Sequence, residues 1–132
     1  MVKTPTYYVF QLYKPFQDAT QLPIEVKSSW YNKDEWTMQA VSAAAARDKA
    51  GIVHVALANL DPNQPATVSA KLAGLSATTV SGRIITASAM DAVNSFDQPN
   101  TVVPQSFTGA SVNGGGLSVT LPPKSVVVLE LR

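Results

Sequence analysis

The 132-residue sequence contains no cysteine, so it can hold neither a disulfide framework nor a thiolate metal site. Charge is also scarce: charged residues make up 14% of the chain, and the formal net charge is +1. This weak charge gives no electrostatic reason to bind nucleic acid or an anionic membrane surface. We therefore expect neither partner. The lack of cysteine is compatible with a cytoplasmic location but does not fix one.

Long apolar runs are lacking as well. No stretch of about eighteen apolar residues occurs, so we expect no transmembrane helix. The first ten residues, MVKTPTYYVF, contain no continuous apolar core followed by a small-residue cleavage site, so we expect no signal peptide. Hydrophobic residues nevertheless make up 45% of the chain, which is enough for the core of one globular domain.

The segment 41–60, VSAAAARDKAGIVHVALANL, predicts two β-strands joined by a polar turn. Gly51 ends that turn, at a position where a positive φ is often needed. We expect the second strand to be central and covered on both sides, because largely apolar residues occupy both of its faces. These are Val53, Val55 and Leu57 on one face, and Ile52, His54, Ala56 and Ala58 on the other.

Further strands are predicted at intervals of about ten to fifteen residues, separated by turns rich in Gly, Pro and Asn. They are expected at Ile24–Trp30, Thr37–Arg47, Thr67–Leu72, Val80–Met90, Leu117–Leu121 and Ser125–Leu131. This pattern indicates an all-β, jelly-roll-like two-sheet β-sandwich with one short N-terminal helix. We expect Val127, Leu129 and Leu131 to form its core together with Val53, Val55 and Leu57.

The N-terminal helix is predicted from Thr4, a helix-capping residue, and Pro5, which suits the first helical position. Pro15 should end this helix near Tyr13 or Lys14. Tyr8, Leu12 and Phe16 recur at helical spacing and form an aromatic-rich stripe. The stripe covers either the end of the chain's own sheet or a domain that lies outside this chain.

Residues that could carry chemistry are few. His54 has no Ser, Asp or metal-ligand partner at a recognisable spacing, so we interpret it as structural. Most of the carboxylates fall in turns or on polar strand faces, although Asp91 and Asp97 flank one loop and could face a ligand. An independent glycosidase would need two carboxylates facing each other across a pocket. Gly114–Gly116 lacks the Lys-Ser/Thr and helix of a phosphate-binding loop and is predicted to be a hairpin turn.

Trp30, Tyr31 and Trp36 cluster within seven residues around a polar turn. If they are exposed, they form a stacking platform for sugar rings; if they are buried, they belong to the core or to an interface. The cluster therefore raises the hypothesis of a carbohydrate-binding module for a plant polysaccharide.

Four segments in order resemble the C-terminal end of the family 51 glycoside hydrolases, the α-L-arabinofuranosidases: TPTYYVFQLYKPFQDA, AVSAAAARDKAGIVHVALANLDP, SGRIITASAMDAVNSFDQPNTVVP and GGGLSVTLPPKSVVVLELR. The resemblance implies an N-terminal (β/α)8 barrel followed by a C-terminal jelly-roll sandwich. Residues 1–17 then resemble the last barrel helix, with Tyr8, Leu12 and Phe16 packing on the barrel, and residues 18–132 form the sandwich. The loop with Asn94, Phe96 and Asp97 resembles a family segment, and we expect it at the domain interface.

The resemblance places both catalytic glutamates in the barrel, so no catalytic residue, cofactor or metal ligand is assigned to this chain. We expect a non-catalytic accessory domain that stabilises the barrel of an arabinofuranosidase acting on arabinoxylan, arabinan or arabino-oligosaccharides. The alternative is the carbohydrate-binding module with Trp30, Tyr31 and Trp36. Without its barrel, the chain is expected to expose the helix stripe, and so to self-associate or to carry a displaced helix.

Overall fold

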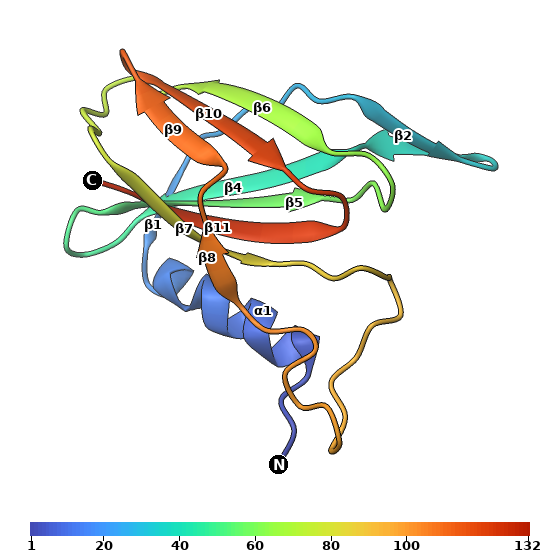
Figure 1. Ribbon diagram of the computed structural model, residues 1–132. Helices are drawn as coiled ribbons and strands as arrows, with labels where there is room; N and C mark the ends of the chain where they lie inside the picture. The colour runs from blue at the N-terminus through green and yellow to red at the C-terminus, as the bar shows by residue number, and fades with distance from the viewer.

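In the computed structural model, which describes residues 1–132, the chain forms a β-sandwich with a helix against one outer face (Figure 1). Its helical part is α1 (Pro5–Tyr13), followed by a 3-10 turn, η1 (Lys14–Phe16). The strands are β1 (Thr20–Leu22), β2 (Trp30–Lys33), β3 (Trp36–Gln39), β4 (Val41–Arg47), β5 (Val53–Asn59), β6 (Ala66–Lys71), β7 (Val80–Ile85), β8 (Gln105–Phe107), β9 (Ala110–Asn113), β10 (Gly116–Leu121) and β11 (Ser125–Leu131).

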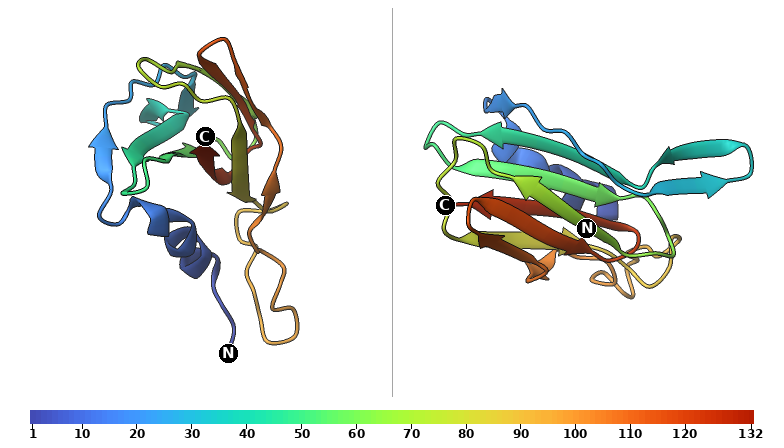
Figure 2. Two further views of the ribbon diagram at one scale, coloured as in Figure 1. Left: turned by 90° about the vertical axis from the view of Figure 1, so that its left-hand side faces the viewer. Right: turned by 90° about the horizontal axis from the view of Figure 1, so that it is seen from above.

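The strands form two packed sheets and a separate hairpin. A six-stranded sheet has the order β1-β4-β5-β11-β7-β8, a three-stranded sheet has the order β6-β10-β9, and β2 pairs with β3 alone. The three-stranded sheet covers one face of the larger sheet, and α1 lies against the other (Figures 1 and 2). The expected all-β sandwich is confirmed, as is the central position of β5 between β4 and β11.

The main core lies between the two sheets. The register pairs Val53 with Leu131, Val55 with Leu129, and Leu57 with Val127. Directly opposite residues share a face of a sheet, so all six side chains point toward the three-stranded sheet. They belong to one buried cluster with Val68, Leu117, Val119 and Leu121 of that sheet, and this confirms the predicted core.

The N-terminal helix begins and ends where the sequence predicts. The Thr4 side chain caps it by accepting a hydrogen bond from the backbone N–H of Tyr7 at 3.1 Å, and α1 ends at Tyr13, before Pro15. Its inner face covers the chain's own sheet. Leu12 is buried in a second cluster with Ala56, Ile85 and Val128 of the outer sheet face.

The stripe of Tyr8, Leu12 and Phe16 is therefore turned toward the chain's own sheet. Tyr8 and Phe16 pack at the margin of the second cluster, and Leu12 lies inside it. The expectation of a displaced helix is wrong, because α1 packs on the apolar outer face of β5, β7 and β11. The surface that α1 leaves open is its other side, which carries Tyr7 and Phe10.

Three predicted strands differ from the structure. The predicted strand Thr37–Arg47 is interrupted at Ala40, so its first part belongs to β3 of the hairpin and the rest forms β4 of the six-stranded sheet. The segment 23–29 is irregular, because the strand that pairs with the free edge of β4 is the preceding β1. Val26 still packs against the core from this irregular segment, which explains the alternating pattern. The predicted strand Val80–Met90 ends at Ile85, which pairs with Val126 in the last rung of the β7–β11 ladder. β11 begins at Ser125, so β7 loses its ladder there and the chain leaves the sheet.

The turns of the two predicted hairpins match the expectations. Gly51 has φ +85° between β4 and β5, and Gly114 and Gly115 have positive φ between β9 and β10. The chain's helices are too short to cross a membrane.

Candidate functional site

The most exposed element is the β2–β3 hairpin, which projects beyond the sandwich as an arm (Figure 2). Its base is tied to the chain beside it: Ala40 donates its backbone N–H to the Ser29 carbonyl at 2.8 Å, and Val41 donates to the Ser28 hydroxyl at 3.2 Å. The arm is therefore a continuous antiparallel ribbon that is attached firmly at one end.

The register of this ribbon divides the three predicted stacking residues between its two faces. Trp30 pairs with Gln39, Tyr31 with Met38, and Lys33 with Trp36. Side chains alternate along each strand, so Tyr31 and Trp36 share one face while Trp30 lies on the other. Closeness in sequence therefore does not create the predicted three-ring platform.

The two tryptophans are open to solvent: 61% of the Trp30 surface and 75% of the Trp36 surface are exposed, whereas Tyr31 is half-buried. Beside Trp30, the Thr37 hydroxyl donates a hydrogen bond to Asn32 Oδ1 at 2.9 Å. Asn32 and Thr37 were not among the candidate residues predicted from the sequence. Counting residues two by two outward from the Asp34-Glu35 turn would have placed both on the Trp30 face.

His54 has the structural role that the sequence predicts, and it has an acidic partner that the sequence analysis missed. Its Nε2 lies 2.8 Å from Asp48 Oδ2, and its side chain is almost fully buried. Asp48 Oδ1 accepts hydrogen bonds from the backbone N–H groups of Ala50 and Ile52, at 2.9 and 3.0 Å. The hydrogen bond from His54 is the largest contribution that lowers the pKa of Asp48. The pair fixes the β4–β5 turn.

The other carboxylates are exposed or engaged in local contacts. Asp61 accepts hydrogen bonds from the backbone N–H groups of Asn63 and Gln64, and Glu130 pairs with Arg132. Asp91 and Asp97, which lie within the β7–β8 loop, are both exposed. This arrangement provides no support for the hypothesis of an independent glycosidase, which needs two carboxylates facing each other across a pocket.

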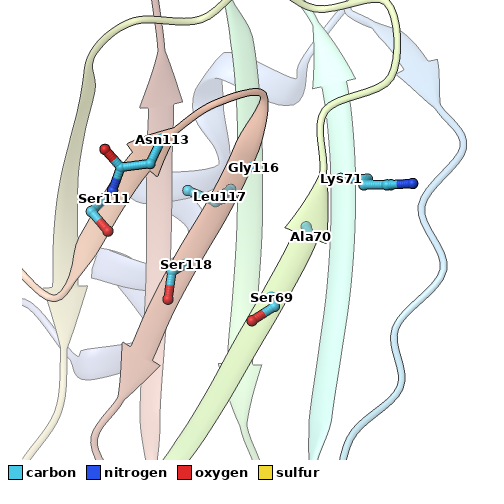
Figure 3. A pocket seen from close by; sticks show the side chains of 8 residues that line it. All are labelled: Ser69, Ala70, Lys71, Ser111, Asn113, Gly116, Leu117 and Ser118. Atoms are coloured by element: carbon cyan, nitrogen blue, oxygen red, sulfur yellow. The ribbon is translucent and has the colours of Figure 1, made fainter.

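The outer face of the three-stranded sheet carries mainly polar side chains (Figure 3). Ser69, Ser118 and Ser111 form one row across β6, β10 and β9. Gly116 lies between Lys71 and Asn113 in the next row, and a shallow depression of about 350 Å³ opens there because Gly116 has no side chain. No aromatic ring lines it, so it offers no stacking platform.

A second hollow, of about 420 Å³, enters the sandwich between β6 and the irregular segment 23–27. Its lining is mostly apolar and includes Ala45 of β4 and Val55 of β5. β4 presents the short side chain of Ala45 here, so the space between the two layers is incompletely filled.

The long β7–β8 loop, residues 86–104, is held near its middle by Asn94. This amide donates to the carbonyl oxygens of Lys3 and Val102, both at 2.8 Å, and its Oδ1 accepts from the Val102 N–H at 2.7 Å. The loop is thereby joined to the segment that leads into α1. Phe96 is 84% exposed on this loop, and Asp97 is also exposed.

Exposed apolar side chains lie on α1 and on this loop, two elements at the same end of the molecule (Figure 1). They are Tyr7 and Phe10 of α1, together with Met90, Val93 and Phe96 of the loop. We call these five residues the end surface. Exposed apolar patches of this kind mark protein–protein contact sites.

Comparison with known proteins identifies the family. The sequence-family model of the alpha-L-arabinofuranosidase C-terminal domain matches residues 1–125. An intracellular exo-alpha-L-arabinofuranosidase of Bacteroides ovatus is 42% identical over the whole chain, which covers 26% of that protein. The GH51 arabinofuranosidase of Xanthomonas axonopodis pv. citri has 45% identity and a TM-score of 0.98, with this chain covering 27% of it.

The thermostable GH51 alpha-L-arabinofuranosidase of Thermotoga petrophila has the same fold at 22% identity, with a TM-score of 0.81 over 99% of this chain and 29% of that one. The chain thus spans about a quarter of the length of these relatives. The sandwich, the order of the matching segments and the family model agree, and the chain belongs to the family of α-L-arabinofuranosidase C-terminal domains.

Proposed function

We propose that this chain is the non-catalytic accessory domain of an α-L-arabinofuranosidase, and that it stabilises the catalytic barrel by packing against it. The parent enzyme would remove terminal arabinofuranosyl residues from arabinoxylan, arabinan or arabino-oligosaccharides. The observation that carries this proposal is the family match over residues 1–125, in relatives that are about four times longer.

The end surface provides the contact that such packing needs. Phe10 and Phe96 are 75% and 84% exposed, an unusual position for large aromatic side chains in an isolated domain. Asn94 ties the loop that carries Phe96 to Lys3, so the two halves of the surface are held together. In this proposal residues 1–17 form the connection to the barrel and residues 18–132 form the sandwich. Tyr8, Leu12 and Phe16 then hold α1 against the outer face of the six-stranded sheet.

The test compares one substitution in two contexts, the isolated chain and the full-length parent enzyme. Phe10→Ser should change the stability of the isolated chain by at most about 0.5 kcal/mol, because the side chain is exposed there. In the full-length enzyme it should cost about 1–3 kcal/mol, because a buried phenylalanine would be lost. Chemical denaturation measures both values, and Thr67→Ser on the outer face of β6 is the matched control.

Equal effects of Phe10→Ser in both contexts would contradict the packing proposal. The isolated chain should also release no nitrophenol from 4-nitrophenyl α-L-arabinofuranoside above the buffer rate. Hydrolysis by the isolated chain would contradict the accessory role.

A further inference from the structure

The two faces of the β2–β3 hairpin differ in chemistry, although both carry a tryptophan. The register gives each face four side chains. One face carries Trp30, Asn32, Thr37 and Gln39, all exposed, and we call it the Trp30 face. The opposite face carries Tyr31, Lys33, Trp36 and Met38.

The Trp30 face has no ionisable residue. One indole ring is flanked by two amides and one hydroxyl. A sugar ring presents C–H bonds above and below its plane and hydroxyl groups around its rim. The electron-rich face of an indole attracts such C–H bonds, and amide side chains can donate to and accept from neighbouring hydroxyls. A neutral glycan therefore fits this face better than a charged polymer does.

Two of the three polar side chains on the Trp30 face are oriented by a hydrogen bond. Thr37 donates its hydroxyl hydrogen to Asn32 Oδ1 at 2.9 Å, which leaves the Asn32 NH₂ group to donate elsewhere. The backbone ladder from Trp30–Gln39 to Lys33–Trp36, together with the bond from Ala40 to Ser29 at the base, holds the arm in shape. Binding to a surface that is ordered beforehand costs less conformational entropy.

We infer that the Trp30 face is a binding site for a neutral polysaccharide, with Trp30 as the stacking ring and Asn32 and Gln39 as its hydrogen-bonding groups. The site lies on the projecting arm, separate from the end surface, so it does not depend on the proposed barrel contact. Trp36 is not part of it.

The chain contains two tryptophans, and this permits a direct test by fluorescence. Trp36→Phe leaves Trp30 as the sole indole, and titration with soluble arabinoxylan should shift its emission until it saturates. Trp30→Phe leaves Trp36 as the sole indole, and its emission should stay constant. Polyethylene glycol at matched mass concentration should change neither signal.

Affinity electrophoresis in gels containing arabinoxylan gives a second measurement that does not use the indole signal. Trp30→Ala should weaken retardation by about tenfold. Asn32→Ala should weaken it by about three- to tenfold, which is the loss expected for one hydrogen-bonding side chain. Lys33→Ala, on the opposite face of the same strand, should leave it unchanged.

Three results would overturn the inference: constant emission from Trp30, a saturable shift from Trp36, or equal weakening by Asn32→Ala and Lys33→Ala. Because both measurements read binding and neither reads hydrolysis or domain packing, their failure would leave the accessory-domain proposal untouched.

Discussion

At the scale of single residues, Asp48 joins a turn to a buried side chain. One carboxylate oxygen accepts from Ala50 and Ile52 in the β4–β5 turn, and the other meets His54. The hydrogen bond from His54 lowers the pKa of Asp48 below its usual 3.8, so the folded state favours the ionised carboxylate. This contribution to stability is fully present above the pKa that Asp48 has in the unfolded chain. It is lost as the pH falls through the lower pKa that Asp48 has in the folded chain.

We therefore expect Asp48→Asn to lower the melting temperature at pH 7, and the difference from the unsubstituted chain to shrink as the pH falls below about 4. Asparagine keeps an oxygen for the two turn N–H groups but loses the charge that faces His54. Asp48→Ala should destabilise the chain further, since it also leaves those N–H groups without their acceptor. Thermal unfolding followed by circular dichroism between pH 3 and 7 measures this. A constant difference across that range would show that the Asp48 charge does not stabilise the fold.

Asn94 shows how far sequence reasoning reaches at this scale. Its segment was predicted to lie at a domain interface, and whether it does remains a prediction. The hydrogen bonds it makes to Lys3 and Val102 could not be predicted, because one partner lies 91 positions away in the chain. Contacts over such distances depend on the packed fold and leave no local pattern.

At the scale of elements, the inner face of β4 leaves part of the core unfilled. Its inner face presents Ala45 beside Val55, and both line the hollow of about 420 Å³. We expect Ala45→Val to stabilise the chain by about 0.5–1 kcal/mol, because it adds apolar contacts and a β-branched side chain to a strand. The melting temperature should rise by about 2–4 °C.

The matched control for this substitution is Ala46→Val on the opposite face of β4. Ala46 is buried and lies directly across from His54, so extra methyl groups there should crowd that ring and lower the melting temperature. If both substitutions shifted stability in the same direction, free space beside Ala45 would not explain the effect.

Elements with strong local signals were predicted well. Thr4, Pro5 and Pro15 set the limits of α1, and the two apolar faces of β5 matched its central position. The segment 23–29 was predicted wrongly, because half-burial alone produces alternation without any ladder. The predicted platform of three aromatic rings is absent for another reason. Proximity in sequence does not determine which face of a ribbon a side chain occupies, whereas the register of the two strands does.

At the scale of the whole molecule, the predicted contact surface changes on α1 only, because the loop with Asn94, Phe96 and Asp97 remains a predicted interface. Leu12 is buried on the chain's own sheet, and the exposed aromatic side chains at that end are Tyr7, Phe10 and Phe96. We therefore expect self-association through the end surface and not through the inner stripe. In the isolated chain no other domain covers these rings.

We expect the isolated chain to self-associate reversibly, with an average mass in sedimentation equilibrium that rises with protein concentration. The double substitution Phe10→Ser/Phe96→Ser should hold the mass near the 14.0 kDa of one chain, because it removes two large apolar contacts from the end surface. Trp36→Ser on the distant hairpin arm is the matched control and should still associate. If this control became monomeric while the double variant associated, the contact between chains would lie on the arm. The end surface would then lose its main support as an interface.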